Sequence, residues 1–467
     1  MDSREIACYN GAEKKKRRYN IMPKLAFMGA GSTVFAKNLV GDILLTPEIK
    51  NIEVALYDID AVRLEESRKM LSSILAWTKR TDARIWATLD RKKALAGANY
   101  VVNAIQVGGY DPCTITDFEV PKKYGLRQTI ADTLGIGGIF RTMRTIPVLE
   151  GFARDMEEVC PDALFINYTN PMAMLTGYMQ RFTPIKTVGL CHSVQICVPR
   201  LLWQLGMEEY KDTCRWKIAG INHQAWLLEI ADKDGNDLYP EIKRRSKAIL
   251  ESTRDIMYKP GSEAYDLVRH DMMQRFGYYI TESSEHTSEY LPWYIKSRCP
   301  ELIDRYKIPL DEYPRRCVKQ IADWEGLRRE LTTKEELEHE KTREFASYII
   351  KAMETDEPYR IHGNVLNTGL ITNLPKSACV EVPCMVDRNG INPCFVGDLP
   401  EQLAAINRTN INVQLLTIKA CRTKKKEDVY MAAMMDPHTA AELSPDDIKS
   451  LCDDLFEAHA GWLPEYR

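Results

Sequence analysis

The sequence has no apolar run long enough to cross a membrane, since no segment of its 467 residues approaches the roughly 20 apolar residues that a spanning helix needs. It also lacks any Cys-x-x-Cys pair. Its 13 cysteines are an odd number and are scattered along the chain, which argues against a disulfide-stapled secreted protein. The formal net charge is only -3, so the charge balance favours neither nucleic acid nor an anionic membrane as a partner. We therefore expect reduced thiols, a cytoplasmic protein, and no nucleic-acid or membrane partner.

The first 21 residues also lack an apolar segment, although they contain the basic run Lys14–Arg18. Without a hydrophobic core this stretch is not a secretory signal. A basic run of this kind is more typical of a disordered tail or a start extension than of a nuclear-targeting signal. We expect the folded protein to begin near Met22, and its length and composition are ordinary for a globular protein of two or three domains.

A glycine-rich turn follows the first apolar stretch, Leu25–Met28. The turn reads Gly29, Ala30, Gly31, Ser32 and Thr33. Phe35, Leu39 and Ile43 then recur every four residues, as on the apolar face of a helix. A strand, a glycine turn and a helix form the context of a dinucleotide-binding turn, because glycines let backbone N–H groups approach a pyrophosphate at the helix N-terminus. The fingerprint is incomplete, since Val34 occupies the position of its third glycine.

The second apolar stretch, Val54–Asp58, ends in a carboxylate. A carboxylate at this point can accept hydrogen bonds from the ribose diol of adenosine and would repel a 2′-phosphate, so NAD is favoured over NADP. The alternative is that Asp58 is a solvated turn residue beside Asp60, which would cap the next helix.

Three further apolar stretches resemble these two: Tyr100–Ile105, Ala163–Ile166 and Lys186–Leu190. Helical patterns separate them, so we predict an α/β fold with a doubly wound, Rossmann-like parallel sheet. Because the carboxyl ends of parallel strands meet at one edge, the polar residues after each strand should line one cleft. The predicted cofactor-binding residues at this edge are Gly29, Gly31, Ser32, Thr33, Asp58, Asn103 and Gln106.

Cys191 and His192 directly follow the last of these strands, so both should face the cleft. Thiolate and imidazole are ligands that suit a borderline or soft divalent metal ion. Ordinary packing or hydrogen bonding is the alternative for such a pair, and the residue pattern alone leaves both open.

Other segments have more general signals. Thr129–Gly138 is glycine-rich and is expected to be a loop over the cleft, while Arg141 and Arg144 on a following helix could hold a polar substrate or form a solvated face. After the sheet, we expect helices over 240–275, a polar and aromatic run up to His286, strands within 364–375 and 380–383, and helices from about 400. We expect a basic extension over 1–21, an NAD-binding domain over 22–215 and an α+β substrate domain over 216–467.

Several short runs together resemble the NAD- and manganese-dependent glycosidases of glycoside hydrolase family 4. These runs are Gly29–Thr33, Ile130–Gly135, Asn170–Met172, Cys191–Gln195 and Gly220–His223. Cys191–Gln195 and Thr281–His286 are also similar to the α-galactosidase branch of that family. The likeness extends over nearly the whole chain from Met22 onward, and implies an enzyme that hydrolyses α-galactosides such as melibiose.

The resemblance implies an unusual hydrolysis that proceeds by oxidation at C3 of the sugar, elimination, addition of water and reduction, with NAD and Mn²⁺ as cofactors. It further implies that Cys191 and His223 are metal ligands and that His192 is the acid that assists the leaving oxygen. Asp132 and Asn170 match substrate-binding residues. Glu282 is our choice for the base at C2, although in relatives this base is a Tyr or an Asp. The resemblance also implies a homo-oligomer, a dimer or a tetramer.

Three alternatives remain open. An α-galacturonidase or α-glucosidase of the same family would share all of these motifs. A lactate- or malate-type dehydrogenase would share the sheet and the glycine turn, but would need no metal ion. A non-catalytic NAD-sensing regulator would not need Cys191, His192 and His223.

Overall fold

The computed structural model describes residues 22–254, 256, 266–342 and 344–467. The basic run predicted to be an extension lies outside the described residues. Among the described residues, none of the helices combines the length and apolarity needed to cross a membrane.

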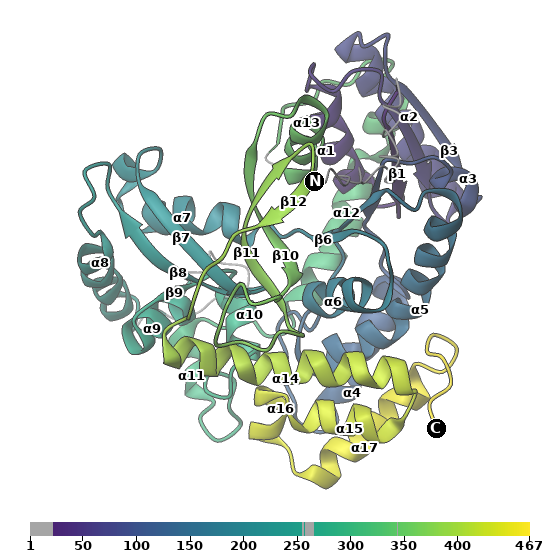
Figure 1. Cartoon of the computed structure of the whole chain (residues 1–467). Helices are drawn as coiled ribbons and strands as arrows, with labels where there is room; N and C mark the ends of the chain where they lie inside the picture. Colours follow the sequence, from purple (N-terminus) through teal and green to yellow (C-terminus); the bar gives the residue numbers. More distant parts are fainter. Residues whose placement is uncertain (1–21, 255, 257–265, 343) are drawn as a thin grey trace, which may run out of the picture.

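A single mixed sheet runs through the molecule (Figure 1). Its first part is parallel, in the order β3 (Arg84–Thr88), β2 (Glu53–Tyr57), β1 (Lys24–Met28), β4 (Tyr100–Asn103), β5 (Leu164–Asn167) and β6 (Thr187–Gly189). This confirms the predicted Rossmann-like sheet. The sequence pattern missed β3, a short strand at the edge of the sheet with a polar residue at each end and no fully buried residue.

The sheet then continues with antiparallel strands. They are β10 (Tyr359–Leu366), β11 (Cys379–Asp387), β7 (Arg215–Ile221), β8 (Gln224–Ala231) and β9 (Tyr279–Ile280), while β12 (Gly390–Pro393) pairs with β11. Asn364 of β10 pairs with Gly189 of β6, and Glu381 of β11 pairs with Gly220 of β7. The β10–β11 hairpin therefore lies between β6 and β7, although it comes much later in the chain.

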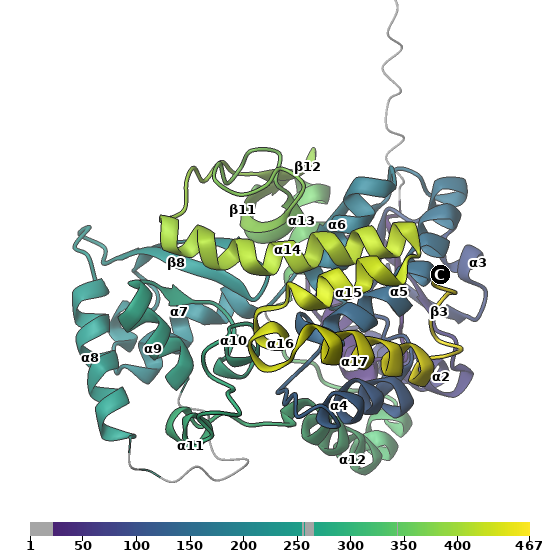
Figure 2. The same ribbon diagram turned by 90° about the horizontal axis from the view of Figure 1, so that it is seen from below.

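Helices cover both faces of the parallel part, which explains why its strands are apolar without alternation. Leu25 and Phe27 point into a core shared with α1 (Thr33–Leu44), α2 (Ala61–Thr78) and α13 (Phe345–Thr355). Ala26 and Met28 point into the opposite core, shared with α5 (Gly135–Val159), α6 (Met172–Phe182) and the C-terminal helices. Figure 2 shows α14 (Glu401–Thr423) and α15 (Lys426–Met434) lying beside α5 and α6.

The remaining helices are short or peripheral. They are α3 (Arg91–Leu95), α4 (Ile115–Lys122), α7 (Ser193–Gln204), α8 (Tyr239–Ser252), α9 (Leu267–Phe276), α10 (Ser284–Glu289), α11 (Glu301–Tyr306), α12 (Glu312–Thr333), α16 (Pro437–Glu442) and α17 (Pro445–Ala458), with a π-helical segment over Gly109–Thr114 and a 3₁₀ turn over Glu208–Tyr210.

The structure corrects three expectations. The predicted cleft loop 129–138 is a loop only up to Leu134, because Gly135 begins α5. A solvated face for Arg141 and Arg144 is wrong, since both side chains are buried. The strand expected within 364–375 ends at Leu366, after which the chain turns.

Arg144 is held by its own partners in the interior. Its Nη1 and Nη2 donate to the two carboxylate oxygens of Asp117 at 3.1 and 2.5 Å, and its Nε donates to the carbonyl of Val107. His459 lies 2.9 Å from the same carboxylate, which ties the C-terminal end of the chain to α4 and α5. Arg144 is therefore explained by packing rather than by substrate binding.

Candidate active site

The carboxyl ends of four parallel strands are level with one another. Met28 pairs with Asn103, Asn103 with Asn167, and Asn167 with Gly189. The residues that follow these positions therefore meet at one edge, as the sequence predicted. The glycine turn after β1 and Cys191 after β6 lie at opposite ends of that edge.

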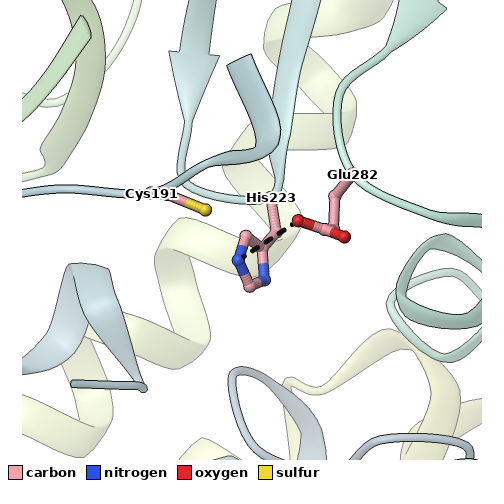
Figure 3. Close-up of side chains that lie close together, drawn as sticks. All are labelled: Cys191, His223 and Glu282. Carbon is pink, nitrogen blue, oxygen red and sulfur yellow. Dashed lines mark ion pairs between the residues drawn. The ribbon is translucent and has the colours of Figure 1, made fainter. Parts of the chain in front are cut away.

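Cys191, His223 and Glu282 come together beside this edge (Figure 3). Cys191 follows β6, His223 lies in the turn between β7 and β8, and Glu282 follows β9. Their ligand atoms all lie within 4.8 Å of one another. A thiolate, an imidazole and a carboxylate at this spacing can hold one divalent cation.

The charges of this group suit a cation. Burial and the negative charges of Glu282 and Glu381 raise the pKa of the Cys191 thiol far above its ordinary value. Burial would also raise the pKa of Glu282, but the charges of His286 and His223 lower it to about 2. The carboxylate is thus ionised, and a bound cation would favour the thiolate that Cys191 does not form alone.

His192 lies next to this group at the start of α7. Its Nε2 is 2.9 Å from Oε2 of Glu344, a buried residue that precedes α13. The hydrogen bond to Glu344 raises the pKa of His192, against the effect of burial. About half of the His192 side chain is exposed. The imidazole can therefore carry a proton near neutral pH and reach a bound ligand.

The two predicted substrate-binding residues contact each other next to His223. Asn170 Nδ2 donates to Asp132 Oδ2 at 3.1 Å, and Thr133 Oγ1 donates to Asp132 Oδ1 at 2.6 Å. Thr133 Oγ1 also lies 3.2 Å from His223 Nδ1. Burial would raise the pKa of Asp132, but Arg141, His286 and His223 lower it. Asp132 is therefore an ionised acceptor beside the candidate metal ligands.

The loop that carries Asp132 is fixed by Glu289 of α10. The Glu289 carboxylate accepts hydrogen bonds from the backbone N–H groups of Thr129, Ile130 and Ala131 at 2.9, 3.1 and 2.9 Å. Ala131 has a left-handed backbone with φ of 54°. The loop conformation is thus set by a side chain far along the chain.

The glycine turn makes close contacts with the neighbouring strands. Gly29 and Ala30 both donate to the carbonyl of Tyr57 at 3.0 Å, and a side chain on Gly29 would clash with the backbone of Ala104 at 2.8 Å. Gly31 donates to Asp58 Oδ2 at 2.7 Å. Val34, at the position of the missing third glycine, is 56% exposed, so no close packing requires a glycine there.

The other predicted cofactor residues differ in accessibility. Ser32 and Gln106 are exposed, whereas Thr33 begins α1 and is buried. Asn103 is fully buried, and its Nδ2 donates to Asn167 Oδ1 at 2.8 Å and to Thr169 Oγ1 at 3.2 Å. Its amide nitrogen therefore positions the turn after β5, while its buried Oδ1 has no hydrogen-bond partner among the described residues.

Sequence reasoning missed other polar groups of the site. His286 lies between the two predicted groups, with Nδ1 3.6 Å from Glu282 Oε1 and Nε2 3.9 Å from Asp132 Oδ1. Its ring centroid is 4.7 Å from that of His223. The polar run that ends at His286 was the available signal. No local signal pointed to Glu344, because its partner lies far away in the sequence.

Comparison with known proteins agrees with these observations. Residues 24–207 match the family described as "Family 4 glycosyl hydrolase", and residues 218–439 match its C-terminal domain. An α-galactosidase of Bacillus subtilis (strain 168) is 61% identical over 446 residues, which cover 96% of this chain and 100% of that protein.

Solved structures show the same fold. The crystal structure of a putative glucosidase from Bacillus subtilis has a TM-score of 0.82 at 26% identity, covering 93% of this chain and 99% of that one. A 6-phospho-α-glucosidase from gut microorganisms, solved with NAD and Mn²⁺, has a TM-score of 0.77 at 19% identity and covers 96% and 100%. The chain belongs to family 4 of the glycosyl hydrolases.

Proposed function

We propose that this enzyme hydrolyses α-galactosides such as melibiose, with NAD and Mn²⁺, by oxidation, elimination, addition of water and reduction. The observation that carries the proposal is the group Cys191, His223 and Glu282 at the sheet edge that also holds a dinucleotide-type glycine turn. The identity of 61% with an α-galactosidase supports the choice of sugar.

Cys191 and His223 hold the metal ion in this proposal, with the carboxylate of Glu282 beside them. Residues at the glycine turn, together with Asp58, Asn103 and Gln106, bind NAD. When bound, NAD supplies reversible hydride transfer at C3 of the sugar, and Mn²⁺ polarises the oxygens on C2 and C3. Asp132 and Asn170 bind hydroxyl groups and fix the orientation of the ring.

Glu282 removes the proton from C2. Its Oε2 is 3.6 Å from His223 Nε2 and its Oε1 is 3.6 Å from His286 Nδ1, so one oxygen faces the metal ligands and the other faces a second imidazole. His192, paired with Glu344, donates a proton to the leaving glycosidic oxygen.

The decisive experiment is hydrolysis of p-nitrophenyl α-galactoside in D₂O with Mn²⁺ and catalytic NAD. Removal of the C2 proton predicts deuterium at C2 of the released galactose and no accumulation of NADH. Hydrolysis without deuterium at C2 would contradict the mechanism, because two-carboxylate glycosidases leave that carbon untouched. Steady NADH formation from a hydroxy acid would favour the dehydrogenase alternative.

The same proposal includes the location, the domain boundary and the oligomeric state of the enzyme. The 12 cysteines among the described residues are all free thiols, which supports a reducing, cytoplasmic location. The first family match ends at residue 207 and the second begins at residue 218, which supports a domain boundary near residue 215. Exposed apolar side chains on α12 support a homo-oligomer.

A further inference from the structure

Arg141 is a buried cation with few partners. Only 6% of the residue is exposed, yet in the part of the chain that the structure describes its guanidinium has one hydrogen bond, a 3.5 Å contact from Nη2 to the hydroxyl of Tyr313. An arginine carries five N–H donors. Arg144, three residues later, shows the contrast, because Asp117 and a backbone carbonyl satisfy it. Arg141 is therefore not explained by a structural ion pair.

The surroundings place Arg141 at the sugar pocket. Of the nearby charges that lower the pKa of Asp132, that of Arg141 has the largest effect, ahead of His286 and His223. No carboxylate among the described residues is within ion-pair distance of the guanidinium. The guanidinium is thus near enough to act on the charge of Asp132 without forming an ion pair with it.

Tyr313 fixes the position of the guanidinium. The Cζ atom of Arg141 lies 5.6 Å from the centroid of the Tyr313 ring. Tyr313 belongs to the first turn of α12, and its N–H donates to the carbonyl of Thr129 at 3.0 Å. The start of α12 is thereby attached to the loop that carries Asp132. Arg141 and Tyr313 thus bring together segments that are far apart in the sequence.

We propose that Arg141, oriented by Tyr313, binds the hydroxyl on C4 of the sugar and makes the enzyme select galactosides over glucosides. The inference rests on the proposed function, in which Asp132 and Asn170 bind hydroxyl groups of the sugar. The buried guanidinium, attached through Tyr313 to the loop that carries Asp132, is then a further donor for a ring hydroxyl. Galactose and glucose differ only in the direction of that hydroxyl.

A buried donor gives strong discrimination. A site built to hydrogen-bond a hydroxyl rejects an analogue that lacks it at that place, because the protein donor is then left unpaired. The planar fork of arginine also fixes the direction of the accepted hydroxyl, which a lysine ammonium does not. Arg141 is therefore suited to distinguish two epimers.

The test compares Arg141→Gln, Arg141→Lys and Tyr313→Phe with the parent enzyme, using p-nitrophenyl α-galactoside and α-glucoside. We expect Arg141→Gln to lower the ratio of kcat/KM for galactoside over glucoside by at least about 10-fold, mainly through KM for the galactoside. Arg141→Lys should fall between Gln and the parent. Tyr313→Phe should lower the ratio by less, because the arginine remains.

Binding of Mn²⁺ and NAD, measured by calorimetry, should be unchanged in the three variants, which shows that the site is intact. Arg422→Gln is the matched control, since this arginine is half exposed on α14, and should keep the parent ratio. An equal loss on both substrates, or an unchanged ratio in Arg141→Gln, would overturn the inference. If Arg141→Gln does not fold, an unchanged ratio in Tyr313→Phe and Arg141→Lys overturns it equally.

The two proposals fail in different ways. A parent enzyme that does not hydrolyse the galactoside contradicts the proposed function. A parent that hydrolyses it while the Arg141 variants keep its preference contradicts only the role of Arg141.

Discussion

Two of the candidate metal-binding residues have backbone conformations that residues other than glycine rarely adopt. His223 has φ of 60° and Glu282 has φ of 66°. Such conformations cost free energy and persist where the surrounding structure holds them in place. Here the β7–β8 turn and the end of β9 supply that support, which fixes the two side chains before a cation arrives.

Replacing Cys191 by serine should abolish metal-dependent activity without unfolding the protein. A serine hydroxyl is much harder to deprotonate than a thiol, so the site loses an anionic ligand and Mn²⁺ affinity should fall by about 100-fold or more. Calorimetry with Mn²⁺ and an activity assay measure the loss, and the melting temperature of the metal-free protein should be unchanged. For the same reason, oxidation of the thiol should inactivate the parent enzyme. Full activity in Cys191→Ser would contradict the metal site.

Replacing Glu344 by glutamine should shift the pH dependence of activity. The carboxylate raises the pKa of His192, so its removal should lower that pKa, and the imidazole would lose its proton at a lower pH. The alkaline limb of the kcat/KM profile should therefore move to lower pH. Glu340→Gln, an exposed position in the same connection, is the control. An alkaline limb that stays in place would show that His192 is not the acid.

The residues that sequence reasoning found are those with a local signal. Cys191 and Asp58 follow apolar strands, and Asp132 and His223 belong to recognisable short runs. For Arg141 the sequence left two alternatives open, and for Glu344 it offered no signal. Their roles depend on partners from other parts of the fold, Tyr313 for one and His192 for the other.

At the scale of elements, the apolar runs gave the strands and their order of appearance, because helices bury both faces of the parallel sheet. The partners of the antiparallel strands could not be predicted, since periodicity carries no information on which distant strand pairs with Gly189 or Gly220. The start of α5 was also missed. Its glycines pack against the preceding loop, where a side chain on Gly138 would clash with Thr133 at 2.8 Å.

The loop before α5 depends on one carboxylate, so Glu289→Ala should be strongly destabilising. The change leaves three buried N–H donors without their acceptor, and we expect the free energy of unfolding to fall by about 3 kcal/mol. Urea denaturation measures the change, with Glu335→Ala, an exposed residue after α12, as the control. KM for the sugar should rise, because Asp132 is carried by the same loop. Unchanged stability would show that the loop is held in another way.

At the scale of the whole molecule, α12 is unusually exposed. It has 22 residues, of which Cys317 is the one that is buried, while Val318 and Ile321, three residues apart on one face, are 55% and 44% exposed. Helices of this length take most of their stability from packing an apolar face. A second copy of the chain that covers this face would account for it.

Size-exclusion chromatography with light scattering should therefore give a mass of at least twice the 53.6 kDa of one chain. Ile321→Glu should reduce that mass, because a charge in the middle of the face would have to be buried on association. Met431→Glu, a similarly exposed position on α15, should leave the mass unchanged. An Ile321→Glu variant with the parent mass would place the contact between subunits elsewhere.

The position of the β10–β11 hairpin has a consequence for how the enzyme is made. Cys191 follows β6 and His223 follows β7. In the sheet these two strands are connected through the β10–β11 hairpin, which the ribosome synthesises after both of them. A nascent chain that stops before residue 359 contains both residues but cannot bring them together. If manganese binds at the proposed site, its loading follows the synthesis of most of the polypeptide, and until then no metal ion protects the thiol of Cys191.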